Sequence, residues 1–537
     1  MDSGQDIIKR SGGIKNAIIQ SIFSGSLSAP SLSPSSGIDT ITSTTTSTST
    51  TSTLVKPAIV EAEEDDATAD LKSSTSKKRT TKQKTEDIDY DLLETLTPEQ
   101  ERVVNLIVDG KKNVFFTGSA GTGKSFVLKH IVARLREKHE KAVYVTAATG
   151  IAAVNIGGVT LHSFAGIKMG HGTPEQLVSK ILKSRIYTKR WTEAKVLVID
   201  EISMVDAELF EKLDVIARTL KVNDKPFGGI QLVLCGDFFQ LPPVVGSYAF
   251  ECEAWKRCVD ECVQLTTVMR QKEGVFVKVL NNLRRGYVTP EAIKVLQDCD
   301  RPLDISNGVL PTKLYSTNQH VDDENTKALE ALEGEPTTFT SIDSGSEELK
   351  DNIERDCPAP QQLTLKVGAQ VVLLRKLDGA KSHLVNGSRG VVVDFVQVKP
   401  KKRMAQWYKA NTTMPVVLFN DGSKVTIKPL EWNIWSERRA SRTQLPLKLA
   451  WALTIHRAQG MTLDKVECRL PKTFANGQGY VALSRVKTLD GLCLHEFSRA
   501  SIRTSYKVIQ FEKTNLRPAL ALANQSPPTP VSYTVKF

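Results

Sequence analysis

The sequence predicts an α/β protein with two sheets, a small β-barrel inserted into the second α/β unit, and a disordered leader. Four short runs that are apolar on both faces predict a parallel sheet covered by helices, at 113–117, 142–146, 196–199 and 231–235. Later stretches of the same kind predict the second sheet, at 263–267, 313–317 and 445–494. Short strands divided by Gly, Asn and Asp turns predict the barrel over 365–444.

These patterns divide the chain into a leader, a first α/β domain, a second α/β domain in two parts around the barrel, and a tail. The expected boundaries, in chain order, are 1–88, 89–262, 263–364, 365–444, 445–512 and 513–537. Residues 31–53 are almost wholly Ser, Thr, Pro and Gly, and acidic and basic clusters follow them. Such a segment cannot bury enough apolar surface to fold, so we expect a disordered leader.

The leader carries two conflicting address signals. Isoleucines interleaved with basic residues over 7–22 are typical of a mitochondrial transit helix, although Asp2, Asp6 and the glycine pair at 12–13 argue against one. The basic cluster over 77–84 is equally consistent with a nuclear address. The expected compartment is therefore the nucleus, the mitochondrion or both.

The remainder of the chain is basic. The formal net charge is +11, and residues 1–90 hold 10 basic and 12 acidic side chains, which leaves 61 basic and 48 acidic ones. This balance favours a polyanion such as nucleic acid, although ribosome binding or a merely soluble surface would look the same. The eight cysteines include no CxxC pair, which favours reduced thiols over a metal site. No apolar stretch approaches the ~18 residues that span a bilayer, so we expect a soluble protein with no membrane partner.

A phosphate-binding loop stands between a predicted strand and a predicted helix. Its residues are GSAGTGKS: Gly118, Ser119, Ala120, Gly121, Thr122, Gly123, Lys124 and Ser125. Glycines allow backbone N–H groups to close around phosphate oxygens at a helix N-terminus. Lys124 is expected to reach the β- and γ-phosphates, and the Ser125 hydroxyl to bind Mg²⁺.

Two carboxylates follow the apolar run at 196–199. Asp200 is expected to hold the Mg²⁺ shell, with Ser125 as the second metal residue, and Glu201 to deprotonate the attacking water. Acidic residues at strand ends are often only solvated, but the phosphate loop upstream favours a functional role for these two carboxylates. An acidic base beside the metal residue indicates hydrolysis and not transfer of the phosphate to a metabolite. Gln240, after the run at 231–235, is a candidate γ-phosphate sensor, although Pro242 and Pro243 would form a turn there in any case.

Further segments follow in a fixed order. They are LTPEQERVV at 96–104, TAATGIAAVNIGGVTLHSF at 146–164, LFEKLDVIARTLK at 209–221, GDFFQLPPV at 236–244, VMRQ at 268–271, YSTNQHVDDEN at 315–325, 445–467, and GQGYVALSRVKTLDGLCLHEF at 477–497. This series resembles superfamily-one helicases, and closely the PIF-type branch (petite integration frequency) with its RecD-like relatives. The resemblance runs from Leu96 to Phe497, about three quarters of the chain.

The resemblance implies two RecA-like motor domains that share one nucleotide. It makes Gln100 the adenine contact, and Arg270 and Arg485 arginine fingers that reach across from the second domain. It implies DNA contacts from both domains: Thr149, Gly150, His162, Ser163, Phe164, Thr454, His456, Arg457, Gln459, Gln478, Tyr480, Ser484 and Lys487. Without the resemblance, His162 and His456 would more readily be structural histidines. Arg457 stands where the family more often has lysine. The arginine keeps the positive charge for a phosphate contact.

The resemblance also implies accessory parts. The barrel is similar to the SH3-like accessory domain that covers the strand path. Its expected phosphate contacts are Lys376, Arg389, Lys401, Lys402 and Arg403, although a lysine-rich loop is usually only solvated. A wedge that separates strands is expected within 158–190.

The function implied is that of an ATP-dependent 5'-to-3' DNA helicase acting in genome maintenance. Its expected partners are ATP with Mg²⁺, single-stranded DNA and duplexes or junctions, and it is expected to work as a monomer on DNA. The alternatives are a single-strand translocase, an RNA or protein remodeller, and a clamp that has lost hydrolysis. The clamp is disfavoured because Glu201, Gln240, Arg270 and Arg485 are all present. Strand polarity rests on the resemblance alone.

Overall fold

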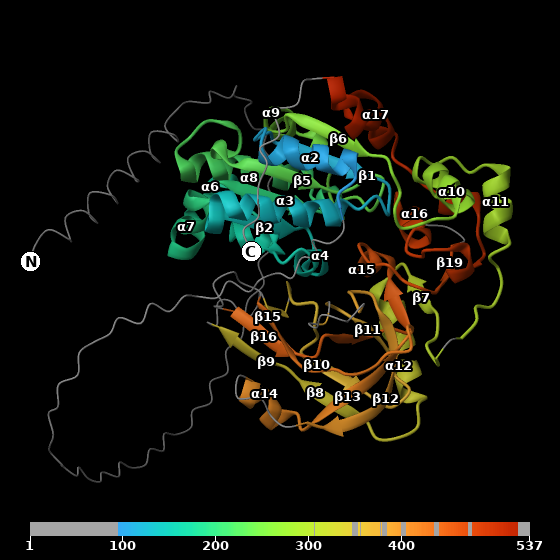
Figure 1. Ribbon diagram of the computed structural model, residues 1–537. Coiled ribbons are helices and arrows are strands. Elements are labelled where there is room, and N and C mark those ends of the chain that lie inside the picture. The colour runs from blue at the N-terminus through green and yellow to red at the C-terminus, as the bar shows by residue number, and fades with distance from the viewer. Residues whose placement is uncertain are drawn as a thin grey trace, which may run out of the picture. The chain divides into compact units, whose positions relative to one another are not determined.

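The computed structural model of the protein describes most of the chain after residue 94 (Figure 1). The described residues are 95–305, 307–345, 353–354, 356–375, 377, 384–398, 404–433, 440–470 and 475–524. The predicted leader, Lys376 and the cluster Lys401, Lys402 and Arg403 lie outside them, as does the tail from residue 525. None of the described helices combines the length and the apolar composition needed to cross a membrane.

The first sheet has seven strands in the order β21-β6-β1-β5-β4-β2-β3, and every neighbouring pair is parallel. The strands are β1 (Val114–Gly118), β2 (Val143–Ala147), β3 (Val159–Thr160), β4 (Val196–Asp200), β5 (Gln231–Cys235), β6 (Glu261–Leu265) and β21 (Arg517–Pro518). Every residue of β1 and of β4 is buried, as the two-sided apolar runs predicted. The four runs assigned to this sheet are therefore confirmed.

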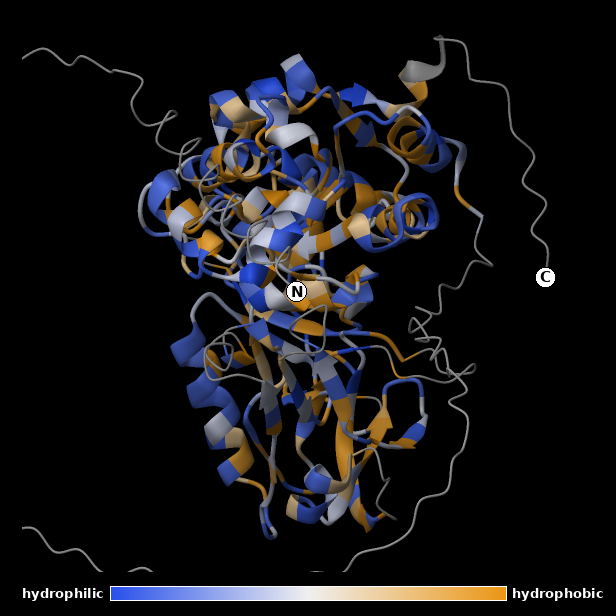
Figure 2. Cartoon of the chain, turned by 90° about the vertical axis from the view of Figure 1, so that its left-hand side faces the viewer, coloured by the Kyte–Doolittle hydropathy of each residue, from blue (hydrophilic) through white to orange (hydrophobic). Residues whose placement is uncertain are grey.

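Helices cover both faces of this sheet. Val114 and Phe116 pack on one face with side chains of α2 (Pro98–Val108) and α3 (Lys124–His139). Phe115 points to the opposite face, where it joins the other core. The helices that supply that core are α5 (Leu161–Ala165), α6 (Pro174–Leu182), α7 (Arg185–Glu193), α8 (Ala207–Lys221), α9 (Glu253–Cys258) and α17 (Tyr506–Asn515). Figure 2 shows hydrophilic and hydrophobic residues interleaved along the helices of the chain, the pattern of helices with one buried face.

Two domain boundaries expected from the sequence are wrong. The run at 263–267 was assigned to the second sheet, but β6 pairs with β1 over five residues of the first sheet. In α17, Val508 and Phe511 pack into the first sheet's core, and β21 adds to its edge, so 506–512 does not belong to the second domain. A strand that is apolar on both faces is predicted to be covered on both faces. The pattern does not show which sheet the strand belongs to.

The second sheet has four strands in the order β18-β7-β19-β20, all parallel. They are β7 (Thr312–Tyr315), β18 (Ala452–Thr454), β19 (Val466–Arg469) and β20 (Leu492–His495). The helices of this unit are α10 (Gly274–Arg284), α11 (Pro290–Gln297), α12 (Asn318–Glu330), α15 (Ile455–Ala458) and α16 (Gln478–Leu483). A second α/β unit is therefore confirmed.

A strand-rich insert interrupts the second unit, as predicted. One sheet has the order β14-β13-β12-β11-β17 and is antiparallel throughout, and smaller sheets have the orders β10-β8 and β15-β16-β9. The strands are β8 (Thr337–Thr340), β9 (Ile342–Gly345), β10 (Gln362–Leu365), β11 (Gln370–Leu373), β12 (Arg389–Gln397), β13 (Thr413–Phe419), β14 (Lys424–Thr426), β15 (Leu430–Asn433), β16 (Ala440–Gln444) and β17 (Leu447–Leu449), with helix α14 (Ala405–Ala410).

The insert is larger than predicted. β8 and β9 lie before the expected start at 365, and β17 lies after the expected end at 444, because their pairing partners β10, β16 and β11 are strands of the insert. One apolar core, which includes Trp407 and Phe419, takes side chains from β8, β10, β11 and β17. Trp432 of β15 and Ala440 of β16 pack instead into the core of the second α/β unit. Closure into an SH3-like barrel stays a prediction.

Candidate nucleotide site and nucleic-acid interface

The phosphate loop joins β1 to α3, as predicted. Gly121 and Gly123 have φ values of +89° and +81°, which only glycine adopts readily. A Cβ atom on Gly121 would lie 2.6 Å from Arg270 Cβ, so a side chain is excluded there. The first turn of α3 has no side-chain cap at Gly123, so its N–H groups are left for an anion.

Lys124 and Gln100 lie against this loop. Lys124 Nζ donates to the Gly118 carbonyl at 2.8 Å and to the Ser119 carbonyl at 3.2 Å, which places its charge on the loop. Gln100 closes a capping box with Thr97 at the start of α2, and its Nε2 donates to the Thr122 carbonyl at 3.3 Å. The structure thus brings both predicted residues to the loop.

Asp200 and Glu201 stand at the end of β4. Burial, together with the neighbouring Glu201, raises the pKa of Asp200 to about 7, although hydrogen bonding by Cys235 and the charge of Lys124 act in the opposite direction. Glu201 has a left-handed backbone, φ +53°, and its N–H donates to Asp200 Oδ1 at 2.9 Å. A residue other than glycine in this conformation is strained, and such strain is concentrated at functional sites.

These donors fit a magnesium ion that is also bound by phosphates. A buried carboxylate beside a second carboxylate is stabilised in its ionised form by a nearby cation. The described residues contain no cluster of three or more His, Cys, Asp or Glu side chains suited to a metal. Mg²⁺ commonly takes one or two protein oxygens and completes its shell with water and phosphate, which matches Asp200 with the Ser125 hydroxyl.

Two residues predicted to contact DNA lie instead at the nucleotide site. Gln459, which follows α15, donates from Nε2 to Glu201 Oε2 at 2.8 Å. The Tyr480 hydroxyl on α16 accepts a hydrogen bond from the Ala120 N–H of the phosphate loop at 2.7 Å. Tyr480 is only 2% exposed, so its ring cannot stack on a base and that prediction is wrong. Both residues bring the second α/β unit to the loop and carboxylates of the first.

The two predicted finger arginines lie close together. Arg485 is 1% exposed and donates to carbonyls of its own unit: Val481, Ala458 and Met461. Burial, together with the charge of Arg270, lowers the pKa of Arg485 to about 9. Arg270 Nη1 donates to the Ser484 carbonyl at 3.2 Å. A pair of like charges of this kind favours an anion beside it.

Arg270 was expected to reach across from the second domain, and that prediction is wrong. It follows β6 of the first sheet, and its backbone N–H donates to the Gly121 carbonyl at 3.1 Å, so it is fastened to the phosphate loop itself. Of the two predicted fingers, only Arg485 belongs to the second unit. The segment VMRQ alone does not show which domain carries Arg270. That depends on the sheet to which the preceding strand β6 belongs, and β6 had been assigned to the second sheet.

Four more predicted DNA contacts are enclosed in the protein. Phe164 is 0% exposed and packs against Trp191 and Tyr144 with ring centroids 4.9 and 5.0 Å apart. The other three are the buried Ser163, whose hydroxyl donates to Asp356, and the fully buried Gln478 and Ser484. Their side chains have no surface for a strand, so these predictions are wrong.

Arg389 in β12 is also enclosed. It is 2% exposed, and its guanidinium donates to the Val371 and Leu310 carbonyls, so the predicted phosphate contact is wrong. Thr149 caps α4 (Gly150–Asn155). At Gly150 a Cβ atom would lie 2.3 Å from the Asp356 carbonyl oxygen, so this close approach needs glycine. His162 is half-buried and Lys487 is exposed, which leaves both predictions open.

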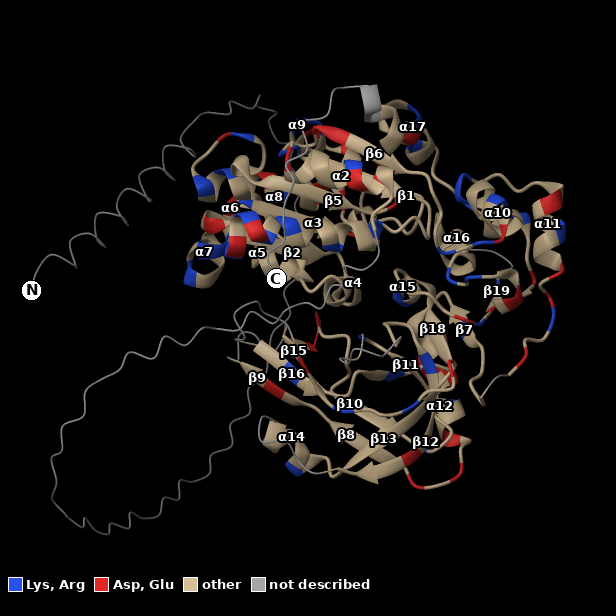
Figure 3. Cartoon of the chain, viewed as in Figure 1, with Lys and Arg blue, Asp and Glu red and all other residues tan. Residues whose placement is uncertain are grey.

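A basic pocket brings three of the remaining predicted DNA residues together: Thr454, His456 and Arg457. It has a volume of about 700 Å³ and is lined by Pro242, Pro243, Val244, Ser316, Thr317, Asn318, Thr454, His456, Arg457, Ala475, Asn476 and Arg503. The lining contains two arginines and no carboxylate. Figure 3 shows blue on α15, whose one Lys or Arg is Arg457. Single strands are bound by cationic grooves with side chains on which bases stack. The lining supplies two arginines and the ring of His456, and its Val244 is 85% exposed.

Sequence reasoning missed several of these lining residues. Arg503 and Asn476 belong to no predicted site, and only the tertiary structure places them beside Arg457. Pro242 and Pro243 follow Gln240, so the turn that carries the predicted γ-phosphate sensor also shapes the pocket. The signal in the sequence was the unbroken run GDFFQLPPV, which joins the two sites.

A phosphate loop, paired strand-end carboxylates and a second α/β unit carrying a buried arginine define a two-domain phosphate-loop nucleotide-binding protein. Residues 95–291 match the family model described as PIF1-like helicase, and residues 348–395 match that of the 2B domain of the DNA helicase Pif1. The chain belongs to the PIF1-like helicase family.

Similar proteins cover most of the described chain. The ATP-dependent DNA helicase PIF1 of Xenopus laevis is 42% identical over 424 residues, covering 78% of this chain and 64% of the relative. The crystal structure of Pif1 helicase from Candida albicans is 44% identical, with a TM-score of 0.63, and covers 78% of this chain and 98% of that one. Pif1 helicase from Bacteroides in complex with ADP-AlF3 and ssDNA is 32% identical, with a TM-score of 0.56 and coverage of 78% and 97%. The chain spans about three fifths of the length of the curated relatives it matches.

Proposed function

We propose that the protein is an ATP-dependent 5'-to-3' DNA helicase that moves along single-stranded DNA. The observation that carries this proposal is a nucleotide site assembled from both α/β units. Gln459 binds the predicted catalytic acid Glu201, and Tyr480 binds the phosphate loop at Ala120. Because side chains of the second unit hold the loop and the acid of the first, a change at the γ-phosphate changes how the two units fit together.

The chemistry of hydrolysis follows from the residues in place. The loop amides and Lys124 hold the phosphates, and Asp200 with Ser125 would hold Mg²⁺, which neutralises charge on the phosphate oxygens when bound. Glu201 takes the proton of the attacking water, and Gln240 senses the γ-phosphate. Arg270 and Arg485 stabilise the charge that develops in the transition state.

Movement on DNA needs a grip that changes with the nucleotide. The pocket contains Pro242 and Pro243, which lie two and three residues beyond Gln240, together with Thr454, His456 and Arg457. Arg457 belongs to α15, which ends one residue before Gln459, the partner of Glu201. We infer that the strand lies in this pocket and that both walls are tied to the nucleotide site. The relatives named as DNA helicases, and the relative solved with ssDNA, support DNA as the substrate.

Several finer assignments belong to the same proposal. The protein acts as a monomer on DNA in genome maintenance, in the nucleus, the mitochondrion or both. The strand-rich insert covers the strand path beside the second unit, and the helices within 158–190 carry the wedge. His162, Thr149, Gly150 and Lys487 are further candidates for strand contact.

Two partial duplexes test the proposal, one with a 5' and one with a 3' single-stranded tail, each with wild type and Lys124→Ala. Unwinding of the 5'-tailed substrate alone, with ATP and Mg²⁺, and its loss in Lys124→Ala support it. If neither duplex opens while single strands still stimulate ATP hydrolysis, the protein is a translocase or remodeller. If single strands bind and ATP is not hydrolysed, it is a clamp.

A further inference from the structure

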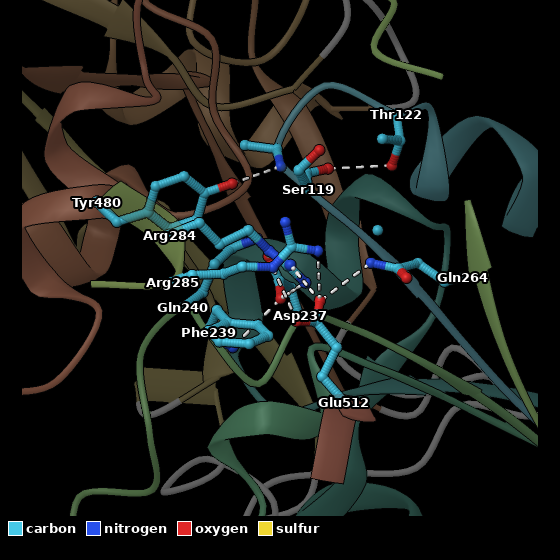
Figure 4. A network of polar contacts seen from close by, with 12 residues as sticks. Ser119, Thr122, Asp237, Phe239, Gln240, Gln264, Arg284, Arg285, Tyr480 and Glu512 are labelled. Atoms are coloured by element: carbon cyan, nitrogen blue, oxygen red, sulfur yellow. Dashed lines mark hydrogen bonds and ion pairs between the residues drawn. The ribbon is translucent and has the colours of Figure 1, made fainter. Parts of the chain in front are cut away.

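A buried ion cluster of Arg284, Asp237 and Glu512 lies beside the nucleotide site and contacts the predicted sensor Gln240 (Figure 4). Arg284, the last residue of α10, is 3% exposed and holds the fully buried Asp237 with two hydrogen bonds. Nη2 donates to Asp237 Oδ1 at 2.8 Å, and Nε donates to Oδ2 at 3.1 Å. The third guanidinium nitrogen, Nη1, donates to Glu512 of α17 at 3.0 Å. All three nitrogens of the guanidinium are therefore engaged.

Asp237 in turn holds the predicted γ-phosphate sensor. Gln240 Nε2 donates to Asp237 Oδ2 at 3.4 Å, and the Gln240 N–H donates to the Asp237 carbonyl at 2.8 Å. The Phe239 N–H donates to Asp237 Oδ1 at 3.2 Å, and the Phe239 ring lies 4.1 Å from the Arg284 guanidinium carbon. The turn that carries Gln240 is thus fastened to one carboxylate, which is fastened to Arg284.

The cluster also joins helices that belong to different cores. α10 packs through Phe276, Leu280 and Leu283 into the core of the second α/β unit. α17 packs through Phe511 into the core of the first. Arg284 therefore connects a helix of the second unit, the sensor turn of the first, and a helix that returns to the first from the end of the chain.

Stability is a poor explanation for such a cluster. Burying charges has a large desolvation cost, and well-packed apolar side chains of similar size are often as stabilising. What a bidentate arginine supplies is a fixed orientation of the carboxylate it binds. Here that carboxylate also binds the side-chain amide of Gln240, whose orientation matters because hydrolysis needs preorganised donors.

We propose that Arg284 is a positioning residue for ATP hydrolysis, which orients Gln240 through Asp237 and ties the sensor turn to α10. The proposal rests on the sensor role of Gln240 in the proposed function. Movement of the sensor turn when the γ-phosphate leaves is then transmitted to α10 and the second unit. Glu512 binds the third guanidinium nitrogen, and this contact keeps the other two nitrogens oriented toward Asp237.

The neighbouring Arg285 provides a matched control. It binds the same Glu512 carboxylate, at 2.9 Å from Nε, but has no bond to Asp237 among the described contacts, and its side chain is 43% exposed. The experiment compares Arg284→Lys with Arg285→Lys in the full chain, since lysine keeps the charge and loses the two-pronged geometry. DNA-stimulated ATP hydrolysis is measured with a polydeoxythymidine strand. Each substitution is also made in a Gln240→Ala background, and the thermal midpoint is recorded for every variant.

Arg284→Lys is expected to lower kcat by about 10- to 100-fold, the usual effect of losing a group that orients a reacting residue. KM for ATP and the affinity for the strand stay near wild type, and Arg285→Lys keeps the wild-type kcat. In the Gln240→Ala background Arg284→Lys is expected to have little further effect, because two residues that act through one path are not additive.

Three results would overturn the proposal. One is an equal loss of kcat from Arg284→Lys with and without Gln240. Another is a lowered thermal midpoint with an unchanged kcat, and the third is an equal loss of kcat from Arg285→Lys. If Arg284→Lys does not fold, Asp237→Asn takes its place, because an amide cannot accept both arginine bonds, and the same expectations apply. A wild type that does not hydrolyse ATP would instead refute the proposed function, and a fully active Gln240→Ala would refute the sensor role.

Discussion

Replacing Tyr480 by Phe removes one hydroxyl from the contact between α16 and the phosphate loop. The Ala120 N–H donates to that hydroxyl across 2.7 Å, and both residues are buried. Leaving a buried N–H without its acceptor costs about 1–3 kcal/mol. At ~1.4 kcal/mol for each factor of ten, this corresponds to about 5- to 150-fold in an equilibrium constant. The cost falls on the arrangement in which both α/β units face one nucleotide.

We therefore expect Tyr480→Phe to lower kcat/KM for ATP within that range and to leave the Kd for a single strand, measured without nucleotide, unchanged. Steady-state ATP hydrolysis at saturating strand gives the first quantity, and fluorescence anisotropy gives the second. Tyr506→Phe is the control, because Tyr506 on α17 is 75% exposed. A variant with wild-type kcat/KM would refute the reasoning, since the hydroxyl would then contribute nothing to the site.

Three further predictions follow from the placement of individual side chains. Phe164→Ala should lower the free energy of unfolding by about 3–5 kcal/mol, as for other buried aromatic residues, and chemical denaturation measures it; a stable variant with weakened strand binding would restore the stacking role that burial denies to Phe164. Arg457→Ala should weaken single-strand binding and reduce the slope of log K against log salt by about 0.7, the value for one lost phosphate contact on a single strand; an unchanged slope in anisotropy titrations would place the strand elsewhere. Glu512→Gln should lower the thermal midpoint at pH 7 but much less at acidic pH, because burial opposes ionisation of Glu512 while Arg285 and Arg284 outweigh it and hold its pKa below the usual value. A depressed pKa stabilises the fold above the unfolded pKa of ~4.3 and loses that contribution as the pH falls through the folded value, so an equal difference in midpoint at both pH values would contradict this account.

The sequence by itself determined the nucleotide-binding half of the site. Gly118 to Ser125 are consecutive, and Asp200 and Glu201 end an apolar run, so strand and helix geometry brings these groups to one edge of the sheet. Short segments of this kind fix their own local geometry, which is why the phosphate loop and the strands β1, β2, β4 and β5 agree with prediction. The same holds for the presence of a second α/β unit and of a strand-rich insert.

Only the tertiary structure decided which side chains of the second unit face the nucleotide. Tyr480 and Gln459 lie hundreds of residues from their partners Ala120 and Glu201, and nothing in their own segments distinguishes a base contact from a loop contact. The pairing of β6 with β1 and the burial of Phe164 and Arg389 were likewise beyond the local pattern. Asp237 and Arg284 are 47 residues apart and Glu512 is 228 residues beyond Arg284. From the sequence alone, a charged residue is expected to be exposed to solvent. Its burial depends on how all the elements pack together and not on its own segment.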